Sequence, residues 1–364
     1  MYLLEFGGED DAFAACEAAS AASGVSRIAP GLALADAVVP RRVRGLAYTH
    51  RASDLVGHTD ADLESARTLL ETAPLEREGS IAVRAVDVHG STGVSTTETE
   101  RALGQVLVDR GFSVDLDDPD HVLRAAFSRG RLEPGGTVEA DAATGDLVRP
   151  LEGGDQRGEH TSVCALGWLE AASVRDFGER APTDKPFFQP GSMDPLLARA
   201  VANVAGAHPG RTVLDPMCGT GGVLVEAGLV GADVIGTDAQ EKMARGAREN
   251  LAHFLEPTEP SPTGVSRGSW HVGRGDATRL PLAADSVDAV VFDAPYGRQS
   301  KIDTHRLADL VSGALAETRR VASRAVVVAD RSWATEARDV GWDLEAAFER
   351  RVHRSLTRYV LVCE

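Results

Sequence analysis

The sequence predicts an α/β fold, with a helix-covered parallel sheet in the C-terminal part and a smaller α+β region before it. Two observations predict this class. In the second half of the chain, short apolar strand-like segments alternate with helix-like segments, which is typical of a parallel sheet covered on both faces. In the first half, strand and helix patterns are mixed without regular alternation, as in an α+β region.

Seven strands are predicted for the C-terminal sheet, and the last two are expected to form an antiparallel pair. They lie at 212–215, 233–238, 270–273, 289–293, 324–329, 348–353 and 358–363. Helix-like spacing of apolar residues fills much of the intervening sequence, at 194–205, 222–230 and 239–254. The strands thus alternate with helices up to the closing pair.

The first half has weaker patterns. Strands are predicted at 2–6, 80–88, 122–128 and 136–140, and helices at 10–23, 61–70 and 97–110. Glycine and polar residues dominate 151–160, and prolines punctuate 182–190. We therefore expect four parts: an N-terminal region at 1–60, a second domain at 61–150, a linker at 151–184 and the α/β domain at 185–364.

Charge and composition narrow the classes of function. The net charge is −17, and three lysines stand against 35 arginines. This negative charge disfavours binding of a phosphate-bearing partner such as a nucleic acid. An acidic enzyme with a small substrate is therefore one open alternative. Acid excess and scarce lysine together indicate a salt-loving host, where the Debye length is about 3 Å at about 1 M salt. The net charge therefore does not exclude RNA as a partner.

Targeting signals and cysteine pairs are not recognisable. No apolar run has the roughly 20 residues that span a bilayer, and the first residues lack the pattern of a signal peptide. The four cysteines form no Cys-x-x-Cys pair. We therefore expect a cytoplasmic monomer without a metal site or disulfides.

A glycine loop follows the strand at 212–215. Residues 215–222 are Asp-Pro-Met-Cys-Gly-Thr-Gly-Gly and precede a helix, so backbone N–H groups can face a ligand. The dinucleotide pattern Gly-x-Gly-x-x-Gly fits Gly219 and Gly221 but fails at Leu224. Asp238 ends the next strand, where a carboxylate can accept both hydroxyls of an adenosine ribose. A tight turn with a capping aspartate is the alternative interpretation.

An acidic residue also follows the third strand. Asp276, in the run Gly-Asp-Ala, could accept a hydrogen bond from an adenine amine. A simple turn aspartate is the alternative.

The motif after the fourth strand predicts the chemistry. It consists of Asp293, Ala294, Pro295 and Tyr296. An exocyclic amine on an aromatic ring is a poor nucleophile because its lone pair is delocalised. An acceptor for its N–H can hold the lone pair towards a methyl donor. The Asp293 side chain and the Ala294 carbonyl can both accept, and Tyr296 offers a face for an extruded base. A strand-ending turn with a packed tyrosine is the alternative.

These motifs resemble the class I S-adenosylmethionine-dependent amino-methyltransferases, whose signature is Asp/Asn-Pro-Pro-Tyr/Phe. The chain departs at Ala294, where the family has proline, and a backbone contact there survives the change. The closing antiparallel pair fits such a Rossmann-like domain by analogy of fold. The resemblance implies S-adenosyl-L-methionine as the cofactor. Its predicted site comprises Asp215, Cys218, Gly219, Gly221, Asp238, Asp276 and Ala277.

An upstream segment resembles the cofactor-contacting segment of THUMP-containing RNA methyltransferases. Residues 185–200 are Lys-Pro-Phe-Phe-Gln-Pro-Gly-Ser-Met-Asp-Pro-Leu-Leu-Ala-Arg-Ala. The resemblance places Phe188, Gln189, Pro190 and Ser192 at the methionine side of the cofactor. An aromatic-proline linker before an amphipathic helix is the alternative.

The rest of the chain resembles the same enzymes. Residues 81–84 and 101–124 are similar to parts of a THUMP RNA-binding domain, with 1–60 as its ferredoxin-like companion. Residues 352–358, Val-His-Arg-Ser-Leu-Thr-Arg, are similar to the ending of archaeal tRNA guanine-10 N2-methyltransferases. The resemblance implies methylation of that N2 amine once or twice. Another tRNA guanine, a ribosomal RNA base, an adenine amine and a non-catalytic THUMP protein remain as alternatives.

Local charge fits tRNA as the partner. The window 37–53 holds four arginines and no acid, and a second basic group lies around 124–131. The predicted RNA-binding residues are Arg41, Arg42, Arg44, Arg51, Arg124, Arg129 and Arg131. A solvated arginine-rich face is the alternative.

Overall fold

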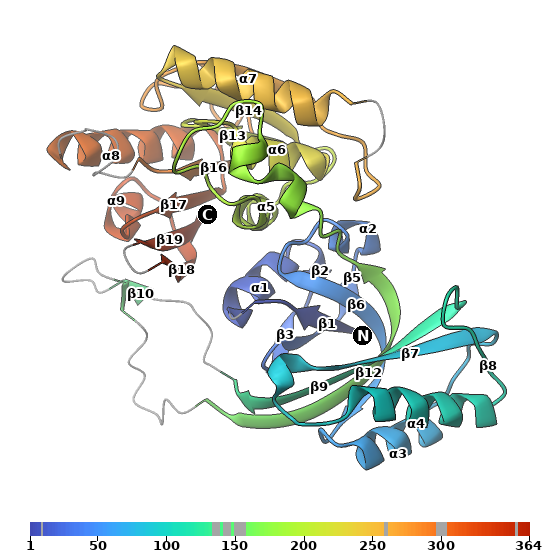
Figure 1. Ribbon diagram of the computed structural model, residues 1–364. Helices are drawn as coiled ribbons and strands as arrows, with labels where there is room; N and C mark the ends of the chain where they lie inside the picture. Colours follow the sequence, from blue (N-terminus) through green and yellow to red (C-terminus); the bar gives the residue numbers. More distant parts are fainter. Residues whose placement is uncertain are drawn as a thin grey trace. The chain divides into compact units, whose positions relative to one another are not determined.

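In the computed structural model, the described residues are 1–8, 10–132, 139–140, 147–148, 158–257, 261–295, 304–353 and 356–364 (Figure 1). The chain forms two compact units. The N-terminal unit comprises 1–135 and 153–173, and the C-terminal unit comprises 136–152 and 174–364. Among the described residues, no helix is both long and apolar enough to cross a membrane.

The N-terminal unit is built on a mixed sheet of eight strands in the described part of the chain, in the order β3-β4-β1-β6-β12-β9-β7-β8. These strands are β1 (Tyr2–Phe6), β3 (Ser26–Ala29), β4 (Leu32–Ala35), β6 (Thr49–Thr59), β7 (Ser80–Asp87), β8 (Ser113–Val114), β9 (His121–Arg131) and β12 (His160–Ala172). Two short strands, β2 (Ala22–Ser23) and β5 (Ala37–Val38), form a separate antiparallel pair.

Helices cover this sheet and bury its apolar residues. They are α1 (Asp11–Ala18), α2 (Pro40–Val43), α3 (Leu63–Thr72), the one-turn η1 (Val88–Gly90) and α4 (Thr96–Asp109). Helices α3 and α4 lie side by side (Figure 1), and Leu70 and Leu103 pack in one cluster with Leu123, Phe127 and Trp168 of the sheet. Ala126 and Ala165 belong to a second cluster with Leu3 and Leu32. Neighbouring residues of β9 and β12 thus serve opposite faces, as strand geometry requires.

The C-terminal unit contains the predicted seven-stranded sheet, in the order β15-β14-β13-β16-β17-β19-β18. Its strands are β13 (Thr212–Asp215), β14 (Asp233–Asp238), β15 (Trp270–Arg274), β16 (Ala289–Asp293), β17 (Ala325–Ala329), β18 (Leu344–His353) and β19 (Leu356–Cys363). The first five are parallel, and β19 runs antiparallel to both β17 and β18.

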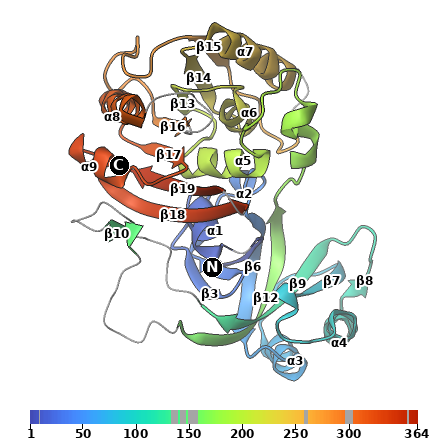
Figure 2. The same cartoon turned by 60° about the vertical axis from the view of Figure 1, so that its left-hand side comes forward.

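Helices cover both faces of this sheet (Figure 2). They are α5 (Pro195–Val204), α6 (Gly222–Leu229), α7 (Glu241–Leu255), α8 (Thr304–Val321) and α9 (Ala334–Asp339). Val290 and Phe292 pack in a cluster with Val311 and Leu315 of α8. Val291, which points to the other face, is equally buried. Burial on both faces explains why these strands are continuous apolar runs. Two one-turn helices, η2 (Phe177–Arg180) and η3 (Pro182–Asp184), precede α5, and β10 (Glu139–Ala140) pairs with β11 (Leu147–Val148).

The α/β class and the seven-stranded sheet are confirmed, but several details of the first half differ. Strands β3, β4 and most of β6 were not predicted. The helix predicted at 10–23 ends at Ala18, because Ala22–Ser23 pair with Ala37–Val38. Strand β12, inside the segment expected as a linker, was not anticipated. Of the strand predicted at 136–140, residues 136–138 lie outside the described residues. The predicted domain limits stay a prediction.

Candidate active site

The predicted motifs of the C-terminal unit lie at one edge of its sheet. Strands β15, β14, β13 and β16 are neighbours and parallel, so their carboxyl ends meet there. From β13 the chain passes to β14 on one side of β13. After β15 it returns to β16, which lies on the other side of β13. Ligands of open α/β sheets bind at such a reversal of strand order.

The glycine loop after β13 turns sharply into α6. Gly219 and Gly221 have φ of +52° and +76°, a conformation that residues with a side chain rarely adopt. At Gly221 an added Cβ would lie 2.6 Å from Leu251 of α7, whereas at Gly219 nothing lies within 4 Å. Gly221 therefore allows the loop to pack on α7, and Gly219 leaves its backbone open to close approach.

Asp238, at the end of β14, holds this loop in place. Its Oδ2 accepts a hydrogen bond from the Gly219 N–H at 3.0 Å, and its Oδ1 accepts from the Gln240 N–H at 2.8 Å. A carboxylate offers about four acceptor sites, so two such bonds leave capacity for a ligand. The predicted acid and the predicted loop are therefore in direct contact.

Asp215 is buried at the start of the loop and accepts a hydrogen bond from the Met217 N–H at 3.0 Å. Burial raises the pKa of this carboxyl well above its ordinary value, against the Met217 hydrogen bond. The carboxylates of Asp238 and Asp293 raise it further. The predicted acids Asp215, Asp238 and Asp293 are therefore close enough for Asp215 to interact electrostatically with the other two.

Cys218 is buried beneath the loop. Burial raises the pKa of its thiol well above the ordinary value, and Asp215 and Asp238 act in the same direction. The thiol is therefore neutral and not a thiolate nucleophile. The Cys218 N–H donates to the Thr237 carbonyl at 2.9 Å, which fixes the loop to β14.

The upstream segment is fastened to the glycine loop by Asn250 of α7, a residue that sequence reasoning missed. The buried Asn250 amide accepts from the Phe187 N–H at 2.8 Å and donates to the Phe187 carbonyl at 2.9 Å. It also donates to the Thr220 carbonyl at 2.9 Å. One side chain thus connects the segment, the loop and α7.

Two further contacts hold this segment. The Ser192 hydroxyl donates to the Gln189 carbonyl at 2.7 Å and lies 3.2 Å from the Thr220 hydroxyl. An added Cβ at Gly246 would lie 2.1 Å from the Phe187 ring, so only glycine lets that ring lie against α7. The expected Ser192 is therefore at the loop.

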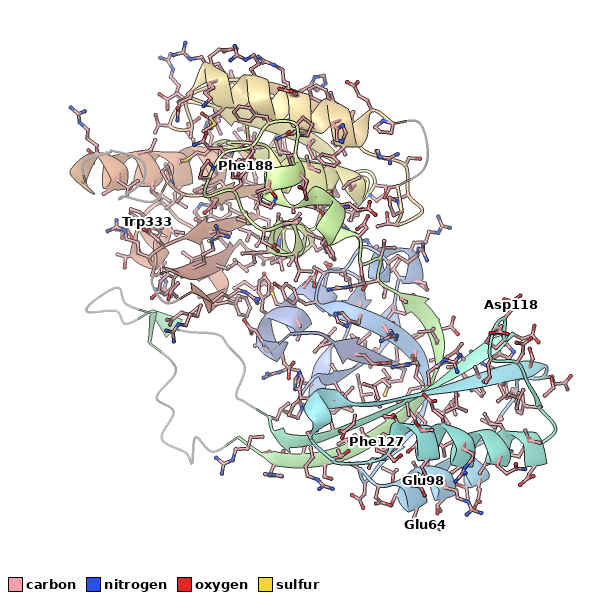
Figure 3. The ribbon with its side chains drawn as sticks, in the orientation of Figure 1. Glu64, Glu98, Asp118, Phe127, Phe188 and Trp333 are labelled. Atoms are coloured by element: carbon pink, nitrogen blue, oxygen red, sulfur yellow. The ribbon has the colours of Figure 1, made fainter. Side chains whose placement is uncertain are left out.

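The remaining predicted residues of this segment are less enclosed. Phe188 is 43% exposed, and Figure 3 shows it on the segment that leads to α5. Pro190 is also exposed, and Gln189 is half-buried.

Asp276 and Ala277 follow β15, the outermost parallel strand. The Asp276 Oδ1 accepts hydrogen bonds from the N–H and the hydroxyl of Thr278, which lower its pKa. Ala277 is buried. The adjacent Gly275 donates to the Asp238 carbonyl at 3.0 Å, so the ends of β14 and β15 are joined. Asp276 therefore closes a turn, whatever else it binds.

Asp293 and Ala294 lie where β16 ends. Ala294 is buried, and its N–H donates to the Val328 carbonyl of β17 at 2.7 Å. The side chain of Asp293 is partly exposed, with Oδ2 3.7 Å from Nη2 of Arg358 in β19. Pro295 is half-buried. Tyr296 lies outside the described residues.

The predicted RNA-binding arginines lie in the N-terminal unit and differ in exposure. Arg41, Arg44, Arg129 and Arg131 are exposed, and Arg51 and Arg42 are half-buried. Arg42 donates to the Ser20 carbonyl at 2.9 Å, and Arg51 lies 3.7 Å from Glu5.

Arg124 differs from the other arginines. It is buried, and its guanidinium donates to both carboxylate oxygens of Glu5, at 2.8 and 2.7 Å. This bidentate pair occupies Arg124 inside the sheet.

Comparison with known proteins identifies relatives. Residues 182–360 match the family model described as RMKL-like, methyltransferase domain. A tRNA (guanine(10)-N2)-dimethyltransferase of Methanothermobacter thermautotrophicus is 32% identical over 328 residues, covering 88% of this chain and 83% of the relative. The enzyme of the same description from Pyrococcus abyssi is 28% identical over 292 residues, covering 79% and 74%. TrmN from Thermus thermophilus, a solved structure, has a TM-score of 0.45 and 23% identity, covering 100% and 99%.

The matched domain takes its methyl group from S-adenosyl-L-methionine, and the residues present fit that group. The open backbone at Gly219 allows close approach, and Asp238 ends the neighbouring strand with acceptor capacity to spare. Among the described residues, no group of three or more His, Cys, Asp or Glu is placed to hold a metal ion. Given the identity to the Methanothermobacter enzyme over most of both chains, this chain belongs to the tRNA (guanine(10)-N2)-dimethyltransferase family.

Proposed function

We propose that this protein methylates the exocyclic N2 amine of guanine 10 in tRNA, in one or two rounds, with S-adenosylmethionine as methyl donor. The observation that carries the proposal is the position of Asp293 at the end of β16, the parallel neighbour of β13, which leads into the glycine loop. A carboxylate beside a cofactor loop is where an amine acceptor is needed. Relatives named for this reaction support the substrate.

The proposed chemistry needs a positioned amine rather than a covalent intermediate. When bound, S-adenosylmethionine supplies an electrophilic methyl group. Asp293 accepts a hydrogen bond from the guanine N–H, and the Ala294 carbonyl accepts a second, so that the nitrogen lone pair faces the methyl carbon. As positive charge develops on nitrogen, the carboxylate stabilises it. The amine proton leaves after methyl transfer, to Asp293 or to water.

The cofactor contacts are proposed from the positions of the motifs. Asp238 accepts the ribose hydroxyls, and Asp276 lies towards the adenine with Ala277 beside it. Backbone groups of the glycine loop approach the cofactor at Gly219. The segment at Phe188, Gln189, Pro190 and Ser192 closes the methionine side. Its fastening to Thr220 through Asn250 and Ser192 supports this assignment.

Recognition of tRNA is proposed for the N-terminal unit, with residues 61–150 as the THUMP domain and 1–60 as its ferredoxin-like companion. The proposed phosphate contacts are the exposed Arg41, Arg44, Arg129 and Arg131, with Arg42 and Arg51 at their margin. Glu17 fixes the backbone that follows Arg41 and Arg44. Its buried carboxylate accepts hydrogen bonds from the N–H groups of Ala47 and Tyr48 at 2.6 and 2.7 Å.

The test is methylation of an unmodified tRNA transcript by the full-length protein with isotope-labelled S-adenosylmethionine. Nucleosides are then separated and identified by mass. We expect N2-methylguanosine and N2,N2-dimethylguanosine, and their loss when guanine 10 of the transcript is replaced by adenine. The replaced transcript keeps every other guanine, so it serves as the matched control.

Each alternative gives a different product. N6-methyladenosine would show that the amine is wrong, and methylation that survives replacement of guanine 10 would show that the position is wrong. Binding of tRNA without any transfer, under conditions where S-adenosylmethionine binds, would favour a non-catalytic RNA-binding protein.

A further inference from the structure

The last strand of the chain brings an arginine to the candidate active site. Strand β19 runs antiparallel to β17, with Tyr359 paired to Ala329 at the carboxyl end of β17. Arg358 comes one residue earlier in β19 and therefore lies at the edge of the sheet where the parallel strands end. Since β17 is parallel to its other neighbour β16, the beginning of β19 lies at the same edge as the end of β16.

Arg358 is buried there and contacts the carboxylate that the proposed mechanism uses. Its side chain is 6% exposed, and Nη2 lies 3.7 Å from Oδ2 of Asp293. A buried guanidinium is stable only when an anion or several acceptors compensate it. Asp293 supplies that anion from β16.

Asp293 also has an acidic neighbour among the described residues. Asp215 of β13 interacts electrostatically with Asp293 and with Asp238 of β14. Like charges at short range favour protonation of one member of such a group, and burial makes Asp215 that member. Arg358 contacts Asp293 from β19 and favours the ionised form of Asp293.

We propose that Arg358 is a positioning residue that keeps Asp293 ionised and oriented to accept the N–H of the substrate amine. This inference rests on the proposed function, since it concerns the same site. Arg358 touches neither the amine nor the methyl group, and it acts through Asp293. The C-terminal antiparallel pair of β18 and β19, called the hairpin below, thereby contributes to catalysis as well as to the sheet.

The test uses full-length Arg358→Met and Arg358→Lys proteins. Methionine keeps the apolar stem and removes the charge, whereas lysine keeps the charge and loses the planar fork. Single-turnover methylation at saturating tRNA and S-adenosylmethionine should slow by about 10- to 100-fold in Arg358→Met, as when other groups that orient a functional ligand are removed. Arg358→Lys should recover part of the rate. The dissociation constant for S-adenosylmethionine should stay near that of the wild type.

The pH profile distinguishes positioning from simple support of the strand. Without the cation the pKa of Asp293 rises relative to the wild type, so its ionised form is lost at a higher pH. The acid limb of the rate profile should therefore move to higher pH in Arg358→Met. In Arg358→Lys it should lie between the acid limbs of the wild type and of Arg358→Met. If the methionine protein does not fold, this movement is measured in the lysine protein alone.

Arg324→Met is the matched control, because Arg324 also supports the hairpin but at its other end. Its guanidinium pairs with Glu345 of β18 at 2.8 Å and with Glu364. This change should lower stability and leave the saturated rate and its acid limb unchanged.

Three results would overturn the inference: a wild-type rate in Arg358→Met, an unmoved acid limb, or the same kinetic change in Arg324→Met. Asp293→Ala separates this from the proposed function, because it should lose at least about a hundredfold in rate. If Asp293→Ala keeps the wild-type rate, the proposed active site is wrong. If the Arg358 variants keep the wild-type rate and Asp293→Ala does not, the inference about Arg358 is wrong and the proposed active site stands.

Discussion

At the residue scale, Asp238 joins the two parts of the candidate cofactor site. It ends β14 and accepts the Gly219 N–H of the loop after β13, so the proposed ribose acceptor also orders the glycine loop. A change at this residue therefore removes an acceptor and loosens the neighbouring backbone at once. Both effects weaken binding of the cofactor.

Asp238→Ala is expected to weaken S-adenosylmethionine binding by about 1.5–3 kcal/mol, the range for hydrogen bonds to a charged group. Asp238→Asn keeps one carbonyl acceptor and should lie between the wild type and Ala. Calorimetric titration measures both. An unchanged dissociation constant in Asp238→Ala, with the fold intact, would contradict the assignment.

Asp215 gives a prediction about pH. Burial and two neighbouring carboxylates raise its pKa, so between the ordinary value of 3.8 and the raised value the folded state holds a proton that the unfolded state releases. The stability from this group is complete below the ordinary pKa and is lost as pH rises through the folded pKa. Asp215→Asn keeps an acceptor for the Met217 N–H and has no such loss.

The free energy of unfolding of Asp215→Asn, relative to the wild type, should therefore increase between about pH 5 and about pH 8. Denaturant unfolding at the two pH values measures it, since one unit of pKa corresponds to about 1.4 kcal/mol. Parallel pH dependence in the two proteins would show that Asp215 is ionised in the fold over this range.

The sequence motifs predicted only part of this site. Asp215 and Asp238 end adjacent parallel strands, and Gly219 and Gly221 lie in the loop after the first of them, so alternation of strands and helices implies that the four residues are found together. Asn250 and Arg358 could not be predicted in the same way. Their roles depend on the packing of α7 and on the antiparallel direction of β19, and neither follows a strand–loop motif. Arg124 shows a further limit, because an arginine within a basic window gives no sign of its partner Glu5, 119 positions away in the chain.

At the element scale, the connection between α7 and the segment before α5 is the least expected feature. The Asn250 amide bonds both backbone groups of Phe187 and the carbonyl of Thr220. The Phe187 ring lies against α7 at Gly246. Helix α7 thereby holds the proposed methionine side of the cofactor site against the glycine loop.

Asn250→Ala should destabilise the protein by about 1–3 kcal/mol, because it leaves buried backbone groups without partners. It should also weaken S-adenosylmethionine binding, since the segment is no longer held. Glu249→Ala, one residue earlier and exposed, is the control and should change stability by less than about 0.5 kcal/mol. Denaturant unfolding and calorimetry measure the two quantities. Loss of stability with unchanged cofactor affinity would show that the segment does not contact the cofactor.

The elements of the two halves were unequally predictable. In the C-terminal unit, strands buried on both faces and separated by helices gave boundaries within a few residues. Strand β12 was missed because it is central in its sheet, between β6 and β9. Its residues from Cys164 to Trp168 are buried throughout, so they lack the alternation that marks a half-exposed strand. Gly167 within it packs against Ser53 and the Asp54 backbone, where a side chain would collide.

At the scale of the whole molecule, a protein of net charge −17 is proposed to bind a polyanion. The outer faces of α3 and α4 carry exposed acids, among them Glu64 and Glu98 (Figure 3). These helices are poor candidates for contact with phosphate. The exposed Arg41 and Arg44 lie in a window without acids, so attraction there is local. High salt would screen the repulsion of the rest of the protein.

The double variant Arg41→Ala, Arg44→Ala is therefore expected to raise the KM for tRNA. Its saturated rate and its affinity for S-adenosylmethionine should not change. The slope of log affinity against log salt should fall by roughly 0.7–0.9 for each phosphate contact that is lost. The matched control is Arg67→Ala, Arg101→Ala, which removes two exposed arginines from α3 and α4 and should leave the slope unchanged. Titration of tRNA at several salt concentrations measures these slopes. Equal slopes for wild type and Arg41→Ala, Arg44→Ala would mean that tRNA is bound elsewhere, because loss of a phosphate contact always reduces the number of counterions released.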